Sequence, residues 1–112
     1  MTESSGVFTF PTTGIYLIQF VGQHNTSGSI NWSQTEIHNT TDNGTYNSVA
    51  FGYASLWNGG SYQSSLAQFK FDVTNTSTHK MTFQTDASDS GASVTGVSGR
   101  FANVLFIRLG DT

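Results

Sequence analysis

The chain has 112 residues, enough for one domain with a modest core, and it holds no cysteine, which excludes disulfides, thiolate metal sites and a cysteine nucleophile. Only 10% of the residues are charged, and the four basic ones are scattered at a formal net charge of −3, which excludes the clustered Lys and Arg of a nucleic-acid site. No apolar run is long enough to cross a membrane as a helix, so we expect no membrane insertion.

Short turn signals recur along the chain and separate runs rich in Phe, Tyr, Val, Ile and Thr. The turns are PTTG (11–14), NTSG (25–28), TTDNG (40–44), NGG (58–60), NTST (75–78) and DASDSG (86–91). This spacing predicts an all-β fold, an antiparallel sandwich or barrel of about 8–10 strands. We expect residues 1–5 to be an N-terminal tail or a truncated first strand, and residues 6–112 to form the domain.

Residues 15–21 form the first long predicted strand, and they are apolar on both faces. Tyr16, Ile18 and Phe20 alternate with Ile15, Leu17 and Val21. A strand in a two-sheet fold normally has one core face and one wet face, so the second apolar face needs a cover.

Three predicted strands in the middle of the chain show ordinary alternation. Residues 65–73 place Phe69 and Phe71 opposite Gln68 and Lys70, and residues 79–84 alternate in the same way. Residues 45–57 are unusual because one face is small. In that run the larger residues are Val49, Phe51, Tyr53 and Trp57, and the smaller ones are Ser48, Ala50, Gly52 and Ala54. The small face leaves room for something to pack closely over it.

The last predicted strand, residues 101–109, is again apolar on both faces. One face carries Phe101, Leu105, Ile107 and Leu109, and the other carries Ala102, Val104 and Phe106. Two sheets of one chain offer no third layer, so a second copy of the chain is the simplest cover for both such strands. The alternative is a curved end of the fold with local loops over these strands.

The stretch GVFTFPTTGIYLIQF (6–20) resembles a motif near the start of the globular head of complement first component, subunit q. Phe8, Pro11, Gly14 and Tyr16 match its pattern F-x-x-P-x-x-G-x-Y. The segments SSLAQFKFDVTNTSTHKMTFQTD and GRFANVLFIRLGD are similar to later strands of that family and occur in the same order. The resemblance covers roughly residues 6–110.

This resemblance implies a tumour-necrosis-factor-like jelly roll that packs as a homotrimer around an apolar axis. We assign Tyr16, Ile18, Phe20 and Phe106 to the trimer interface. Family members usually have one more strand before the motif, so either the chain is trimmed or a neighbouring copy supplies that strand.

Exposed aromatic side chains are the predicted recognition surface. Trp32, Tyr46, Trp57 and Tyr62 lie near amide side chains, a combination that holds sugars or partner peptides, and they are our candidate ligand-facing residues. The acids Asp86 and Asp89 offer oxygens for calcium, but their loop lacks the alternating acids of an EF-hand and Asp and Ser also form turns, so no cofactor is predicted. The three histidines show no metal-ligand spacing, and no catalytic constellation is present, so we do not expect an enzyme.

Low charge, abundant Asn, Thr, Ser and Gly, and a start without signal-peptide features are typical of short jelly-roll domains in tailed bacteriophage virions. We therefore expect a trimeric structural protein on the virion surface, a fibre tip or a capsid decoration. Its partners would be other virion proteins and a host-surface glycan. The alternative is a soluble extracellular recognition module of the complement-head type that binds glycan or protein ligands.

Overall fold

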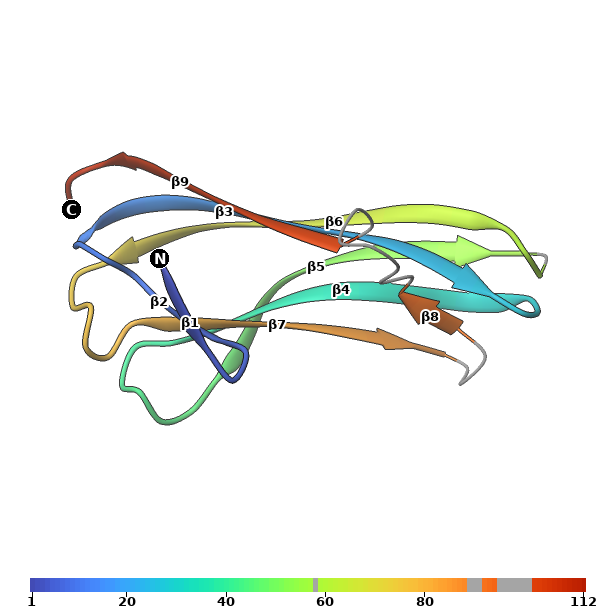
Figure 1. The fold of residues 1–112 in the computed structure, drawn as a ribbon, viewed down its shortest axis with the longest axis horizontal. Helices are drawn as coiled ribbons and strands as arrows, with labels where there is room; N and C mark the ends of the chain where they lie inside the picture. The colour runs from blue at the N-terminus through green and yellow to red at the C-terminus, as the bar shows by residue number, and fades with distance from the viewer. Residues whose placement is uncertain (58, 89–91, 95–101) are drawn as a thin grey trace.

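Every regular element of the described chain is a β-strand, and the strands form two antiparallel sheets (Figure 1). The structure is a computed structural model that describes residues 1–57, 59–88, 92–94 and 102–112. Its strands are β1 (Thr2–Ser4), β2 (Val7–Thr9), β3 (Gly14–Thr26), β4 (Ile30–Thr40), β5 (Asn47–Leu56), β6 (Tyr62–Val73), β7 (Lys80–Ala87), β8 (Ala92–Val94) and β9 (Ala102–Gly110). This confirms the all-β antiparallel architecture that the turn spacing predicts.

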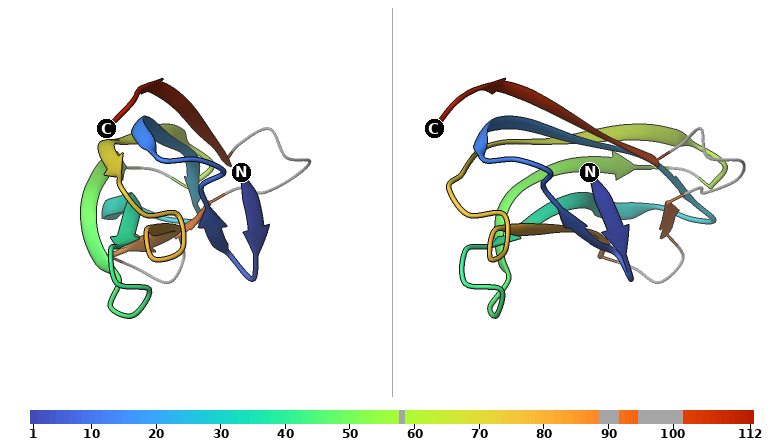
Figure 2. Two further views of the ribbon diagram at one scale, coloured as in Figure 1. Left: turned by 90° about the vertical axis from the view of Figure 1, so that its left-hand side faces the viewer. Right: turned by 60° about the vertical axis from the view of Figure 1, so that its left-hand side comes forward.

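The first sheet has the strand order β1-β2-β7-β4-β5. In the second sheet β3 is central, with β6 along one edge and both β9 and β8 along the other. β9 pairs with residues 15–22 of β3, and β8 pairs with residues 24–26. The left view of Figure 2 shows β9 and the β1–β2 hairpin on the same side of the molecule.

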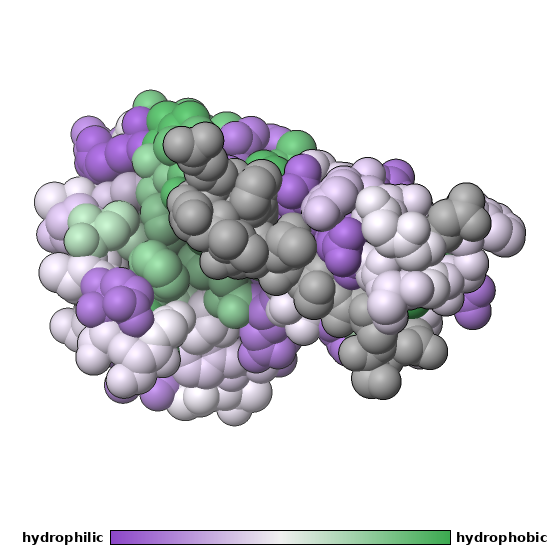
Figure 3. Space-filling model, turned by 45° about the vertical axis from the view of Figure 1, so that its right-hand side comes forward, coloured by the Kyte–Doolittle hydropathy of each residue, from purple (hydrophilic) through white to green (hydrophobic). Residues whose placement is uncertain are grey.

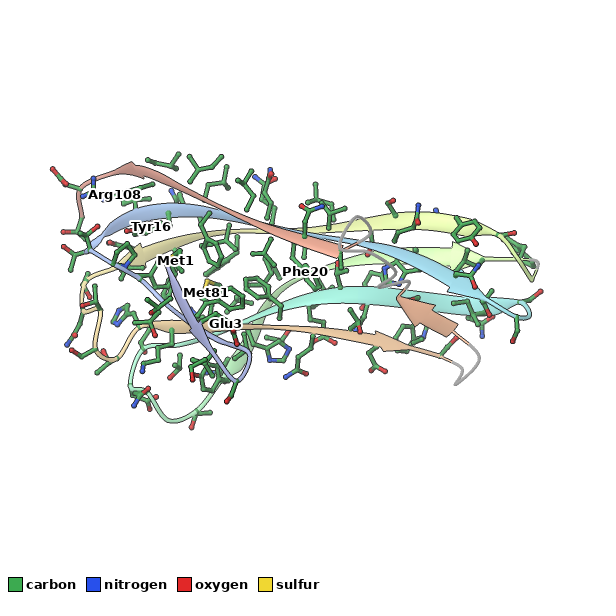
Figure 4. The ribbon with its side chains drawn as sticks, in the orientation of Figure 1. Met1, Glu3, Tyr16, Phe20, Met81 and Arg108 are labelled. Carbon is green, nitrogen blue, oxygen red and sulfur yellow. The ribbon has the colours of Figure 1, made fainter. Side chains whose placement is uncertain are left out.

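The core lies between the sheets, because successive side chains of a strand point to opposite faces. Burial alternates strictly along all of β3, which sends Tyr16, Ile18 and Phe20 inward. Figure 4 shows Tyr16, Phe20 and Met81 between the two layers. The buried cluster also contains Phe10, Ile37, Ala67, Phe71 and Val73, with Phe8, Val49, Ala50, Phe69, Phe83, Val104 and Phe106 packed against it.

Aromatic rings join the two sheets along the side where β2 and β9 lie. The Phe8 ring is 5.5 Å from that of Phe106 and 5.2 Å from that of Phe83, measured between centroids. Phe83 in turn packs on Phe20 at 5.3 Å. Tilted and edge-on contacts of this kind are favourable for aromatic pairs beyond their burial of area.

At the other end of β3 the interior becomes polar. Gly22, His24 and Thr26 continue the inward row after Phe20, and all three are buried. Ser33 and Ser65 face them from β4 and β6 and are buried as well. The sandwich therefore has an apolar half and a hydrogen-bonded half.

Gly52 closes the sandwich on the side where β5 meets β6. A Cβ at this position would overlap the backbone of Leu66, with the Leu66 carbonyl carbon 2.5 Å away. On the same face of β5, Ala54 and Leu56 are buried. The small face of residues 45–57 thus packs closely against the second sheet, and a larger residue at Gly52 would keep the two sheets apart.

The N-terminal residues form a short hairpin at the edge of the first sheet. β1 pairs with β2, with Thr2 opposite Thr9 and Ser4 opposite Val7. Ser5 and Gly6 occupy the turn at φ values of 52° and 79°, the positive angles that a two-residue hairpin turn of type I′ requires. Residues 2–4 are therefore a paired strand rather than a free tail.

Candidate functional site

The outward residues of β3 and β9 combine into one aliphatic surface. Leu17 lies opposite Ile107, so two strands that are apolar on both faces stand side by side. Ile107 and Leu109 are 40% and 56% exposed. We call this surface the aliphatic face; its residues are Ile15, Leu17, Val21, Leu66, Leu105, Ile107 and Leu109. Figure 3 shows apolar surface gathered at the top of the molecule, where β9 lies.

The interface residues assigned from the sequence lie on the wrong side of these strands. Tyr16, Ile18 and Phe20 are buried within a single chain, and Phe106 packs inward against Phe8 and Phe10. That assignment is corrected: these side chains form the core, and the opposite set faces outward. Phe101, which the sequence places with Leu105, is outside the described residues.

Polar side chains border the aliphatic face on β6. Gln68 lies opposite Gln19, and their amides form a hydrogen bond of 3.3 Å. Lys70 is exposed next to Leu17, and Asp72 is exposed next to Ile15. An apolar centre with a polar rim is the usual anatomy of a surface at which proteins associate.

The first sheet carries a different exposed surface, made of aromatic rings. Phe51 and Tyr53 point outward from β5, and Trp57 continues the same row directly after the strand. Tyr53 and Trp57 are 57% and 81% exposed. Trp32 of β4 contacts the Tyr53 ring edge-on at 6.2 Å, and Phe51 contacts it at 5.3 Å. We call Trp32, Phe51, Tyr53 and Trp57 the aromatic strip.

A row of polar side chains on β4 runs beside the aromatic strip. Gln34 lies opposite Tyr53, and Glu36 lies opposite Phe51. The Glu36 carboxylate accepts hydrogen bonds from Gln34 Nε2 and, at 3.3 Å, from Ser48 Oγ. His38 Nε2 lies 2.8 Å from Glu36 Oε2. We call Gln34, Glu36 and His38 the polar row.

Two of the four predicted ligand-facing residues belong to the strip. Trp32 and Trp57 are members of the aromatic strip. Tyr62 lies on β6 of the second sheet, and Tyr46 is partly buried in the loop before β5. Sequence reasoning did not single out Phe51 and Tyr53, which are 56% and 57% exposed beside the tryptophans. The sequence did contain a signal for their exposure, because Phe51 and Tyr53 alternate with the small residues that face the other sheet.

His24 sits at the centre of the hydrogen-bonded half of the core. Its Nδ1 hydrogen-bonds Ser33 Oγ, its Nε2 lies 2.6 Å from Ser65 Oγ, and Ser65 Oγ lies 3.0 Å from Thr35 Oγ1. One ring nitrogen donates and the other accepts when the imidazole is neutral. Burial lowers the pKa of His24 because the charged form loses its hydration. This network is a structural element of the interior.

The acids of the described residues act mainly in turns and ion pairs. The Asp42 carboxylate accepts hydrogen bonds from Thr40, Gly44 and Thr45, and these hold the pKa of Asp42 below its usual value. Asp86, the described member of the predicted calcium pair, is exposed on β7, and Asp89 lies outside the described residues. Within residues 1–57, 59–88, 92–94 and 102–112, no group of three metal-ligating side chains comes together.

No protein-family model matches this sequence, and no curated protein matches it at a significant level. In the part of the chain that the structure describes, no helix is long and apolar enough to span a membrane.

Proposed function

We propose that the chain is a non-enzymatic structural protein that assembles as a homotrimer on a virion surface, as a fibre tip or a capsid decoration. The aliphatic face is the observation that carries this proposal. Its members come from all three long strands of the second sheet, and Leu66, Leu105, Ile107 and Leu109 are each at least 40% exposed. An apolar patch of this kind on a soluble chain marks a contact surface.

The strand pairing supports the jelly-roll assignment. The pairs β4–β5, β3–β6 and β2–β7 are nested, each enclosing the previous one in the sequence. A long hairpin wound into two sheets has this pattern, which is the basis of a jelly roll. The next enclosing pair would join β9 to a strand that precedes β2, but β1 pairs with β2 instead.

The edge of β9 adds a second reason for assembly. Within the described residues β9 pairs only with β3, so its other edge offers unpaired backbone groups next to the aliphatic face. Natural proteins cover or charge such edges to prevent uncontrolled pairing. A neighbouring copy that packs over the aliphatic face would shield this edge as well. The threefold arrangement itself follows from the resemblance to the complement-head family.

The extracellular recognition module is the second candidate, and the aromatic strip favours it because ligand-binding surfaces are enriched in Trp and Tyr. Both candidates use the same fold and the same trimer. Genes for capsid and tail proteins next to the coding gene would support the virion module. Genes for secreted proteins with collagen-like stalks would support the alternative.

Light scattering over a concentration series of the wild-type protein tests the proposed assembly. We expect a mass of three chains that does not change as the protein is diluted through the micromolar range. A stable monomer at every concentration would overturn the proposal, since the aliphatic face would then be exposed in the functional protein.

A further inference from the structure

The aromatic strip and the polar row have the chemistry of a sugar-binding surface. The strip exposes aromatic side chains, whereas the aliphatic face exposes branched aliphatic ones. We propose that the aromatic strip binds a neutral oligosaccharide, with pyranose rings lying on Tyr53 and Trp57 and hydroxyl groups turned toward the polar row. This inference deepens the proposed function, because it rests on the chain being a displayed surface-binding module and names its ligand class.

Aromatic faces suit sugars because of their charge distribution. The face of a ring is electron-rich, and it attracts the weakly positive C–H groups on the apolar side of a pyranose ring. Phe51 and Tyr53 lie on the outer side of β5, and Trp57 follows the end of the strand, with Ser55 between Tyr53 and Trp57. At about 3.3 Å per residue this row extends over roughly 20 Å, which is long enough for several linked sugar units.

The Tyr53 ring at the centre of the strip is held by ring contacts before any ligand arrives. The Tyr53 ring lies between Trp32 and Phe51, with interplanar angles of 87° and 68°. Tyr and Trp have few rotatable bonds, so ordering them on a ligand costs little entropy. A pre-organised platform keeps more of the contact energy for binding.

The polar row supplies hydrogen-bonding groups at the correct place. Gln34 and Glu36 lie directly opposite Tyr53 and Phe51, one strand away, a spacing of about 4.8 Å. A sugar ring on the strip therefore has its hydroxyl edge above amide and carboxylate groups. The Glu36 carboxylate is oriented by Gln34, His38 and Ser48.

Charge selects a neutral ligand over an acidic one. Glu36 is one carboxylate beside the strip, and Asp86 is a second, opposite Gln34 on β7. His38 is the basic group that faces Glu36. An anionic sugar would be repelled by the two carboxylates, whereas neutral hydroxyl groups donate to them.

The two tryptophans of the chain, Trp32 and Trp57, both belong to the strip, so tryptophan fluorescence reports on this surface alone. The experiment titrates the full chain with three neutral sugars, maltohexaose, cellohexaose and the β-1,4-linked tetramer of N-acetylglucosamine. We expect a saturable fluorescence change with at least one of them and weaker binding of sialyllactose. Tyr53→Ala should weaken the binding at least tenfold, equal to about 1.4 kcal/mol.

Tyr62→Ala is the matched control. The sequence places Tyr62 among the ligand-facing candidates, but Tyr62 is 63% exposed on the second sheet, outside the strip, so the present proposal predicts unchanged binding. The proposal is overturned by a flat response to all three neutral sugars, by unchanged binding in Tyr53→Ala, or by tighter binding of sialyllactose. A change of solution mass in Tyr53→Ala would also overturn it, since the strip would then be an interface between copies. The trimer is tested by mass and the sugar site by fluorescence, so either can fail without the other.

Discussion

Both outer faces of the molecule expose large apolar side chains, but the two faces differ in kind. The second sheet presents Leu and Ile around a strand edge, and its polar neighbours lie at the rim. The first sheet presents Phe, Tyr and Trp, and its polar neighbours form a continuous hydrogen-bonded row beside the rings. Branched aliphatic chains gain by excluding water, which any apolar partner provides, whereas aromatic faces with adjacent hydrogen-bonding groups select a ligand by shape. From this comparison we propose that one sheet serves assembly and the other serves recognition.

The largest expected effect is the loss of assembly in Ile107→Asp. Association would bury an unpaired carboxylate on the aliphatic face, at a cost of about 3–5 kcal/mol, so the copies should associate at least 100-fold more weakly. Light scattering should then show one chain, while circular dichroism still shows a β-fold.

Gln84→Asp is the control for this variant, because it places the same carboxylate on the exposed outer side of β7. It should keep the wild-type mass. If Ile107→Asp also keeps the wild-type mass, the aliphatic face is not the contact between copies.

The next largest effect is a loss of stability from a change at the point where the two sheets meet. Gly52→Ala places a methyl group against the Leu66 backbone, and overpacking of this kind costs about 1–3 kcal/mol. Chemical denaturation should therefore show a lower midpoint for Gly52→Ala. The same change at Gly28 is a control, because a Cβ there meets no atom within 4 Å. Equal midpoints for both variants would mean that the sheets do not approach each other as closely as the structure indicates.

A smaller change in the free energy of unfolding is expected from pH, through His24 at the hydrogen-bonded end of the core. Because burial lowers the pKa of His24 in the folded chain, the unfolded chain binds a proton more readily. The free energy of unfolding should therefore be highest above pH 6.5 and fall as the pH drops below 6.5 toward the folded pKa of His24. His24→Gln should reduce this dependence, as measured by denaturation between pH 5 and pH 8. An unchanged pH dependence in His24→Gln would show that other groups cause it.

The smallest change in stability is expected from Tyr53→Thr. Its side chain is 57% exposed and its ring contacts only Trp32 and Phe51 among the described residues, so the free energy of unfolding should fall by about 1 kcal/mol, the value of such aromatic contacts. Thr keeps the β-propensity of the position. A loss of several kcal/mol on denaturation would show that Tyr53 is a structural residue and not a ligand-facing one.

The fold class was predictable because turn signals and alternation are local properties of the sequence. Alternation also separated the residues of β3 correctly into two sets, Tyr16, Ile18 and Phe20 against Ile15, Leu17 and Val21. It did not say which set faces the core, since both are apolar. The pairing of β3 with β9 and the packing of Phe8 on Phe106 decide that, and both are contacts between residues far apart in the sequence.

The candidate surfaces were only partly predictable for the same reason. Trp32 and Trp57 stood out by residue type, but the ring contacts that join Trp32 to Tyr53 depend on the register of β4 and β5. A bulge between Ile30 and Ser33 sets that register. Bulges re-aim side chains in a way that no periodic pattern shows.

Thiol labelling of Leu109→Cys and Tyr53→Cys tests the division between the two faces most directly. The chain has no cysteine, and the two positions are 56% and 57% exposed in a single chain, so exposure within one chain predicts no large difference in their labelling. With a maleimide reagent and no sugar present, we expect Tyr53→Cys to react at the rate of an unfolded thiol and Leu109→Cys to react at least tenfold more slowly. Equal, fast labelling of both positions at high protein concentration would contradict the assignment of the aliphatic face to assembly.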